Sequence, residues 1–280
     1  MERLFKLSKS EQALVQFILL AWAVVVLFPF ALAILNSLKP SVGAVYRNPF
    51  ALPEVWQFSN YADAWIKADF ARYFLNSVII AAGSVILVLF CASTTAFVLA
   101  RMPFKGSTLI FIAFLIGVIV PIRLALAPLV TIVRFLNLDN NLLGLILIQS
   151  ASMMPIAVFI LTAFLQKIPK DLEEAAMIDG ALPFRIYAQV ILPLVRPALA
   201  TIALLTFVQA WNEFFFPLIF LRDAQLFPLT LGITEFRKAF SVQWHLMFAG
   251  IIIMLVPTIL AFLLASKQFI AGLAQGGVKE

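Results

Sequence analysis

Residues 13–38 read ALVQFILLAWAVVVLFPFALAILNSL, and no charged side chain occurs between Glu11 and Lys39. A helix that crosses the hydrocarbon core of a bilayer needs about 20 consecutive, mostly apolar residues. Inside lipid every backbone amide must find its hydrogen-bond partner within the protein, which favours a helix for a run of this kind. The stretch therefore predicts a membrane-spanning helix.

The same run could be mistaken for a secretory signal peptide. Arg3, Lys6 and Lys9 precede it as a basic segment, and Ala31-Leu32-Ala33 looks like a cleavage site. The apolar part of a signal peptide has only about 7–15 residues, however, which is much shorter than this run. We therefore expect the segment to remain as the first span.

Five further apolar runs follow along the chain. The third is interrupted by Pro121, Arg123 and Pro128, and the fifth carries Glu213 and Pro217. The residue alternation of a membrane β-barrel is absent. We therefore expect an all-α membrane protein with six transmembrane helices in one domain, residues 1–280. The spans are expected at about 13–38, 76–100, 108–133, 142–166, 197–221 and 246–266, with a long connector at 167–196.

Composition agrees with a membrane protein and excludes several other classes. Hydrophobic residues make up 63% of the chain and charged residues 12%, whereas soluble domains are about half apolar and about a quarter charged. The net charge of +6 comes from basic residues scattered between apolar runs, which is not the stripe that a nucleic acid would require. Basic residues that flank membrane spans account for the charge.

The basic residues also predict the orientation of the chain. Arg101 and Lys105 fill a very short connector, and the N-terminal segment is basic as well. Short loops with Lys and Arg stay on the cytoplasmic side. With six spans the two termini share a side, so we expect both termini to be cytoplasmic.

Signatures of catalysis are missing from the sequence. There is no phosphate-binding loop, no nucleophile elbow and no paired-histidine metal motif. Cys91 and His245 are the only cysteine and the only histidine, so neither a disulfide nor a metal cluster is expected. We expect no catalytic residue, no metal and no cofactor, and the chain is not expected to be an enzyme. Any energy source must be an ion gradient or another subunit.

The connector at 167–196 carries the most informative pattern. Pro169 followed by acidic residues indicates a helix start, because negative charge is favourable at the positive end of the helix dipole. Leu172, Ala175, Ala176 and Asp179 fall at helical spacing along one side, and Gly180 can supply the left-handed residue that ends a helix. An apolar stripe then predicts a second short helix before Pro193.

The run Glu174-Ala-Ala-Met-Ile-Asp-Gly-Ala181, with Tyr187, Val190, Leu192 and Pro193 behind it, resembles the EAA loop of ABC importer permeases. That family usually has Phe and Ile where this chain has Tyr187 and Val190, and both changes keep the apolar character. Three other stretches resemble the carbohydrate-uptake branch, in particular the smaller maltose-type permease. They are Asn36-Ser37-Leu38-Lys39, Trp211-Asn212-Glu213-Phe214 and residues 272–279.

The resemblance implies a location, a set of partners and a role for the loop. It implies a multi-pass protein of the bacterial inner membrane that pairs with a second, homologous permease subunit. It also implies two ATP-binding subunits, which hold ATP and Mg²⁺, and an extracytoplasmic solute-binding protein that delivers a carbohydrate. The loop would be a coupling helix in a cleft of the ATP-binding subunit. Its implied coupling residues are Glu174, Ala175, Ala176, Asp179, Gly180, Ala181, Tyr187 and Pro193.

Four residues within or near the spans are candidates for a translocation pathway or gate: Arg123, Trp211, Asn212 and Glu213. Charged groups are costly in a membrane and usually face protein or a water-filled cavity. The alternative is that they make structural polar contacts between helices.

A gradient-driven secondary transporter is the rival interpretation of the whole chain. It predicts intramembrane acids and an internal repeat. Glu213 is the one acid deep in a span, and the sequence shows no convincing repeat. A membrane enzyme is a third possibility, opposed by the missing nucleophile and base.

Overall fold

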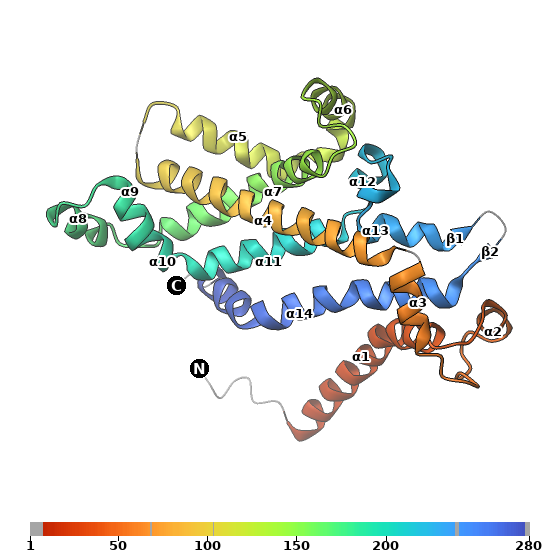
Figure 1. Ribbon diagram of the computed structural model, residues 1–280. Coiled ribbons are helices and arrows are strands. Elements are labelled where there is room, and N and C mark those ends of the chain that lie inside the picture. Colours follow the sequence, from red (N-terminus) through yellow and green to blue (C-terminus); the bar gives the residue numbers. More distant parts are fainter. Residues whose placement is uncertain (1–7, 68, 103, 239–240, 278–280) are drawn as a thin grey trace. The chain divides into compact units, whose positions relative to one another are not determined.

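The computed structural model of the chain describes residues 8–67, 69–102, 104–238 and 241–277, and helices dominate it (Figure 1). Arg3, Lys6, Val278 and Lys279, on which parts of the sequence argument rest, lie outside these residues. The helices form two compact units. The first contains the chain up to Phe70 together with Ile233–Leu255, and the second contains Ala71–Gly232 together with the residues from Val256 onward.

The first unit is built around the N-terminal span. Helix α1 (Lys9–Ser37) starts with a capping box, in which the Ser8 hydroxyl accepts from the Glu11 amide and the Glu11 carboxylate accepts from the Ser8 amide. Such reciprocal bonds satisfy two amides that a helix start leaves unpaired. The other elements are α2 (Val42–Arg47), α3 (Ser59–Lys67), η4 (Ile233–Phe236), an antiparallel pair of two-residue strands, β1 (Arg237–Lys238) and β2 (Ser241–Val242), and the start of α14 (Trp244–Gly277).

The second unit contains the remaining helices. Its core consists of two clusters of buried apolar side chains along α4 and α7, one around Val88 and Val158 and the other around Ile80 and Leu145. Its elements are α4 (Phe70–Arg101), α5 (Ser107–Ile119), η1 (Ile122–Ala125), α6 (Leu126–Phe135), α7 (Leu142–Leu165), α8 (Asp171–Ile178), α9 (Pro183–Ile186), the π-helical turn η2 (Tyr187–Ile191), α10 (Leu192–Leu194), α11 (Arg196–Asn212), α12 (Phe215–Phe220), η3 (Ala224–Leu226) and α13 (Leu229–Gly232).

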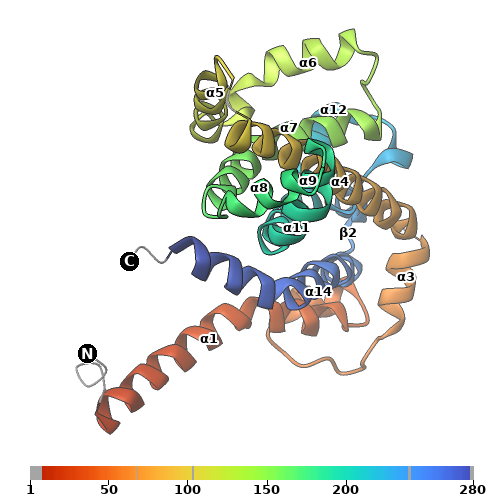
Figure 2. The ribbon, with the colours of Figure 1, turned by 90° about the vertical axis from the view of Figure 1, so that its left-hand side faces the viewer.

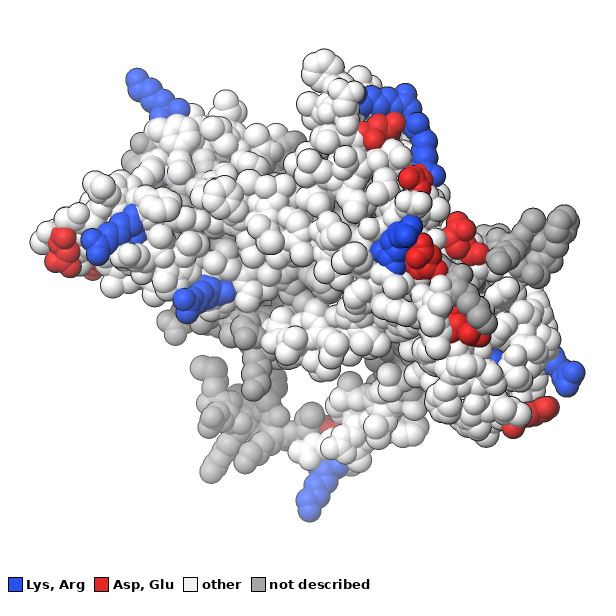
Figure 3. All heavy atoms as spheres, in the orientation of Figure 1, with Lys and Arg blue, Asp and Glu red and all other residues white. Residues whose placement is uncertain are grey.

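Four helices in the described part of the chain, α1, α4, α7 and α14, are each long and apolar enough to cross a membrane. The number rises to six if each of two bent helix pairs is counted as one span. The charged residues in the second unit gather at its two ends, and the surface between them is apolar in this view (Figure 3). This distribution is the one that a bilayer requires.

The expected third span, 108–133, is not one straight helix. Helix α5 ends at Ile119, and the helical segment from Ile122 to Phe135 is bent away from it by 95°. Pro121 explains the break, because it has no amide hydrogen and forces the preceding residue out of the helical region. Val120 is extended, with ψ of 116°.

The expected fifth span, 197–221, is also interrupted. Helix α11 ends at Asn212 and α12 begins at Phe215, with an extended Glu213 between them. Pro217 cannot donate to the carbonyl of Glu213 four residues earlier, and its ring clashes with that carbonyl in a regular helix. The Glu213 carbonyl instead accepts a hydrogen bond of 2.8 Å from the Thr230 hydroxyl.

Candidate functional site

The connector between α7 and α11 forms a helix, a glycine turn and a second helix, as the sequence predicts. In Figure 1, α8 and α9 lie together at one end of the second unit, and Figure 2 shows them from that side. Asp171, Glu173 and Glu174 occupy the first turn of α8, where acidic side chains interact favourably with the helix dipole.

Gly180 ends α8 in the left-handed conformation, with φ of +78°. The Ala181 amide donates to the Ala176 carbonyl at 2.9 Å, and the Gly180 amide donates to the Met177 carbonyl at 3.0 Å. These two bonds make a Schellman motif, which requires a residue that tolerates positive φ. The predicted turn residue is therefore confirmed.

The outer surface of this loop is apolar and exposed. Ile178 is 87% exposed and Phe184 is 78% exposed, and Leu172, Met177 and Leu182 are exposed as well. We call these five residues the apolar ridge. An exposed apolar patch of this kind indicates a surface that contacts another protein or a membrane.

A buried ion pair holds α8 against the spans. Arg101, in the last turn of α4, places Nε 2.7 Å from Oε1 of Glu173, and the two side chains are only 5% and 9% exposed. The Arg101 Nη2 also donates to the carbonyls of Leu165 and Ile168, at 2.8 and 2.7 Å. The guanidinium thus links three segments, because it lies in the last turn of α4, pairs with α8 and donates to the carbonyl of Leu165 at the end of α7, which also accepts from the Ile168 amide.

Tyr187 forms a second link between the loop and α4. Its hydroxyl lies 2.7 Å from the buried Ser93 hydroxyl, and its ring packs 5.3 Å from that of Phe97. Since Ser93 Oγ lies 2.6 Å from the Leu89 carbonyl and can donate there, the Tyr187 hydroxyl is the donor between the two. Tyrosine in place of phenylalanine at this position therefore adds a hydrogen bond inside the unit.

The second helix of the connector does not end before Pro193, in contrast to the expectation. It passes through the π-helical turn η2, in which the Leu192 amide donates to the Tyr187 carbonyl, and continues through α10. A bend of 76° then separates it from α11. A wider turn before proline lets the chain continue although Pro193 cannot donate an amide hydrogen.

The eight predicted loop residues differ in their exposure. Tyr187 is buried, and Ala176 and Ala181 are half-buried against the core. The exposed ones are Glu174, Ala175, Asp179, Gly180 and Pro193. Sequence reasoning missed Arg101 and Glu173 as site residues, because it treated Arg101 only as an orientation signal and Glu173 only as a first-turn acid.

The structure brings two of the predicted pathway residues together at the break in the fifth span. Arg123 Nη2 lies 3.6 Å from Glu213 Oε2, and the guanidinium carbon lies 5.1 Å from the centre of the Phe215 ring. The other carboxylate oxygen of Glu213 accepts from the amides of Phe215 and Phe216 at the start of α12. Glu213 is buried and Arg123 is exposed, so the pair joins an interior carboxylate to an open surface.

The other two pathway candidates differ from each other. Trp211 is 1% exposed and packs against the rings of Phe74 and Phe207, each at 5.5 Å. Neither face of its ring is open to a ligand in this conformation. Asn212 is exposed, and its amide donates to the Val208 carbonyl at 2.8 Å.

The comparisons with known proteins agree with this geometry. A family model described as the binding-protein-dependent transport system inner membrane component matches residues 89–267. The chain belongs to this family. The matched segment includes the α8 loop, the Arg101–Glu173 pair and the break at Glu213, and the proteins of this family are inner-membrane components.

Two relatives illustrate the similarity. The diacetylchitobiose uptake system permease protein NgcG of Streptomyces coelicolor is 36% identical over 261 residues, which cover 92% of this chain and 86% of the relative. The arabinooligosaccharides transport system permease protein AraQ of Bacillus subtilis is 33% identical over 256 residues, which cover 90% of each protein.

A solved structure confirms the predicted fold class. A chain from the crystal structure of a bacterial ABC transporter, involved in the import of the acidic polysaccharide alginate, matches with a TM-score of 0.83. The match covers 94% of this chain and 99% of that chain at 23% sequence identity. The expectation of an all-α membrane fold is therefore confirmed.

Proposed function

We propose that this chain is the transmembrane permease subunit of an ATP-driven importer for a carbohydrate, which is a sugar, an oligosaccharide or a sugar derivative. Residues 1–280 would act as one permease domain and form half of the translocation pathway. The observation that carries the proposal is the α8 loop, whose apolar ridge projects outward while Arg101 and Tyr187 hold its base to α4. The relatives that are uptake permeases for diacetylchitobiose and arabinooligosaccharides support carbohydrate as the cargo.

The proposed partners follow from this role. A second, homologous permease subunit completes the pathway, and a solute-binding protein delivers the carbohydrate from outside. Two ATP-binding subunits hold ATP and Mg²⁺ and receive the α8 loops, so hydrolysis takes place in them. Glu174, Ala175, Ala176, Asp179 and Gly180 transmit their closure to the spans. Nucleotide then favours one of two permease conformations because it stabilises that conformation more than the other.

The ion pair between Arg123 and Glu213 is the proposed gate of the pathway, together with Asn212. Its distance of 3.6 Å and the exposure of Arg123 make it easier to open than the pair at Arg101, because water can solvate the Arg123 guanidinium when the pair separates. It also lies where two broken spans meet, and broken helices in transporters border on cavities.

We also propose that both termini are cytoplasmic. On a Cys91→Ala background, single cysteines at Ser8 and Lys279 should resist impermeant thiol reagents in intact cells, and a cysteine at Ala51 should react. If either terminal cysteine reacted as fast as the cysteine at Ala51, the proposed cytoplasmic location of the termini would be refuted.

Co-purification and uptake together test the function. A tagged chain should retain an ATP-binding subunit in mild detergent, and uptake of labelled oligosaccharide should stop when ATP is depleted while the ion gradient is maintained. Uptake that survives ATP depletion but stops with an uncoupler would favour the gradient-driven alternative instead.

A further inference from the structure

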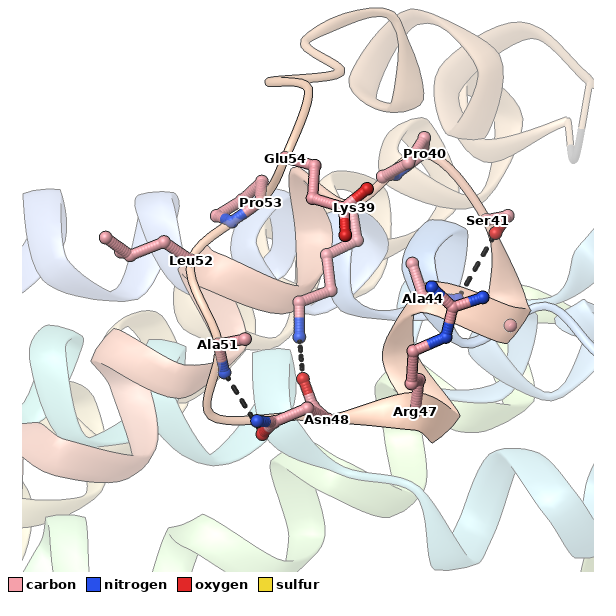
Figure 4. A pocket seen from close by; sticks show the side chains of 11 residues that line it. Lys39, Pro40, Ser41, Ala44, Arg47, Asn48, Ala51, Leu52, Pro53 and Glu54 are labelled. Carbon is pink, nitrogen blue, oxygen red and sulfur yellow. Dashed lines mark hydrogen bonds between the residues drawn. The ribbon is translucent and has the colours of Figure 1, made fainter.

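A hollow of about 240 Å³ lies in the first unit (Figure 4), and none of the residues that line it belongs to the α8 loop or to the proposed gate. Three charged side chains line it: Lys39 directly after α1, Arg47 at the end of α2, and Glu54. Asn48 and Leu52 line it as well. The hollow therefore presents two cations and one carboxylate within one small space.

Lys39 is the unusual member of this set, because it is only 2% exposed. Its Nζ donates to the Asn48 carbonyl at 2.6 Å (Figure 4), and this is its one hydrogen-bond acceptor among the described residues. An ammonium group has three donors, and a buried charge without a counterion is costly. Burial lowers the pKa of Lys39 for the same reason, since the charged form loses hydration. An anion in the hollow would supply the missing acceptor.

The backbone around Lys39 is held in place. The Gln57 amide donates to the Leu38 carbonyl at 2.9 Å. The Asn60 side chain donates to the carbonyls of Ser37 and Lys39, at 2.7 and 2.8 Å. Lys39 is thus presented from a fixed position, so little ordering is needed when a ligand binds.

The chain that lines the hollow folds back along the first span. The Asn36 side chain donates to the Pro49 carbonyl at 2.9 Å, and the Phe50 ring stacks on that of Phe28 with centroids 6.3 Å apart. Phe28 lies nine residues before Ser37, the last residue of α1. The Phe50 ring therefore contacts the first span about 13 Å along the helix from its end. Phe50, Leu52, Trp56 and Phe58 are exposed, as expected for side chains at a membrane interface.

We propose that this hollow binds the headgroup of a membrane phospholipid, specifically phosphoethanolamine. The phosphate lies against Lys39 and Arg47, and the ammonium lies toward Glu54. Basic side chains at the membrane interface bind lipid phosphate. The segment that lines the hollow folds back along the first span, which would place the hollow at the level of the lipid headgroups. A free phosphate ion offers no cation to match Glu54, and it would not explain why the same segment exposes Phe50, Leu52, Trp56 and Phe58. The site does not depend on the solute that the protein carries.

Photo-crosslinking of the full complex in nanodiscs tests the site. The discs contain phosphatidylethanolamine and phosphatidylglycerol in equal amounts, with a trace of phosphatidylethanolamine that carries a photoreactive group close to the headgroup. Peptide mapping should find the label on residues 39–54. Lys39→Met should reduce it about tenfold, because one charge-assisted hydrogen bond is lost. Arg47→Gln, an exposed position that leaves the fold intact, should also reduce it, while Arg134→Gln on α6 should not.

Each other outcome contradicts the proposal in a defined way. Labelling of residues 39–54 that is unchanged in both Lys39→Met and Arg47→Gln overturns the site. Loss of labelling in millimolar inorganic phosphate at constant ionic strength shows a site for the free ion and overturns the lipid assignment. Glu54→Gln should shift labelling from a phosphatidylethanolamine probe toward a phosphatidylglycerol probe, and an unchanged ratio overturns phosphoethanolamine as the headgroup.

Discussion

Gly180→Val should abolish coupled transport while the chain still inserts into the membrane at normal abundance. Gly180 has φ of +78°, a conformation that β-branched residues adopt only with strain. A Cβ at this position would meet no atom of this chain within 4 Å, so within the chain the strain comes from the backbone conformation. The Schellman bonds that end α8 would be lost, and the apolar ridge on both sides of the turn would change direction.

A matched control separates this backbone effect from the effect of adding a side chain to the loop. Gly180→Asn also adds a side chain, but asparagine tolerates the left-handed region far better than valine does. It should keep most of the transport and most of the bound ATP-binding subunit. The measurement is oligosaccharide uptake together with pull-down of that subunit, at equal membrane abundance.

Glu174→Lys tests the same loop by reversing the charge of one exposed side chain. Glu174 is exposed in the first turn of α8, so within this chain the change removes only a dipole interaction of about 0.3–1 kcal/mol. A sharp loss of transport would therefore report a contact with the partner subunit. Asp171→Lys, which changes the dipole interaction in the same turn, should have a much smaller effect. Normal uptake and normal subunit retention in both Gly180→Val and Glu174→Lys would overturn the proposed coupling role of the loop.

The length of the apolar runs predicted the helices well, because a long uncharged segment inside a bilayer can adopt few structures other than a helix. The sequence marked Pro121 and Pro217 as irregular positions, but proline content alone does not decide where a span breaks. Pro29, Pro155 and Pro257 lie inside continuous helices, whereas Pro121 and Pro217 accompany breaks. The difference depends on partners far along the chain, as the Thr230 hydroxyl on the freed Glu213 carbonyl shows. No local pattern around Pro217 contains this information.

In the coupling loop, too, the sequence predicted the local structure but not the contacts with other helices. Local chemistry predicted the start of α8, its end at Gly180 and the helical spacing. The spacing placed Leu172 and Ala175 on one side, but it could not show which of two adjacent glutamates turns inward. Glu173 is buried and Glu174 is exposed because Arg101, on another helix, pairs with Glu173. Periodicity predicts a face of a helix, and only the tertiary structure decides what that face meets.

Arg101→Met should destabilise the protein more than any other single change in the loop region. It leaves the carboxylate of Glu173 buried without a counterion, and it removes the guanidinium donor from the carbonyls of Leu165 and Ile168. The Leu165 carbonyl still accepts from the Ile168 amide. Loss of one partner from a buried ion pair costs about 3–5 kcal/mol. We expect a lower melting temperature in detergent and a loosened α8, with weaker retention of the ATP-binding subunit.

The double variant Arg101→Met/Glu173→Met shows whether the pair itself is responsible. With both charges removed, the site is apolar, and apolar replacements for a buried pair are often neutral or stabilising. The double variant should therefore be more stable than Arg101→Met alone, although the carbonyl of Ile168 still lacks the guanidinium donor. Tyr187→Phe serves as the control, because it loses a single buried hydrogen bond worth about 1 kcal/mol and no charge. If the destabilisation by Arg101→Met simply added to that by Glu173→Met, the two side chains would act independently, and the anchoring role of the pair would be refuted.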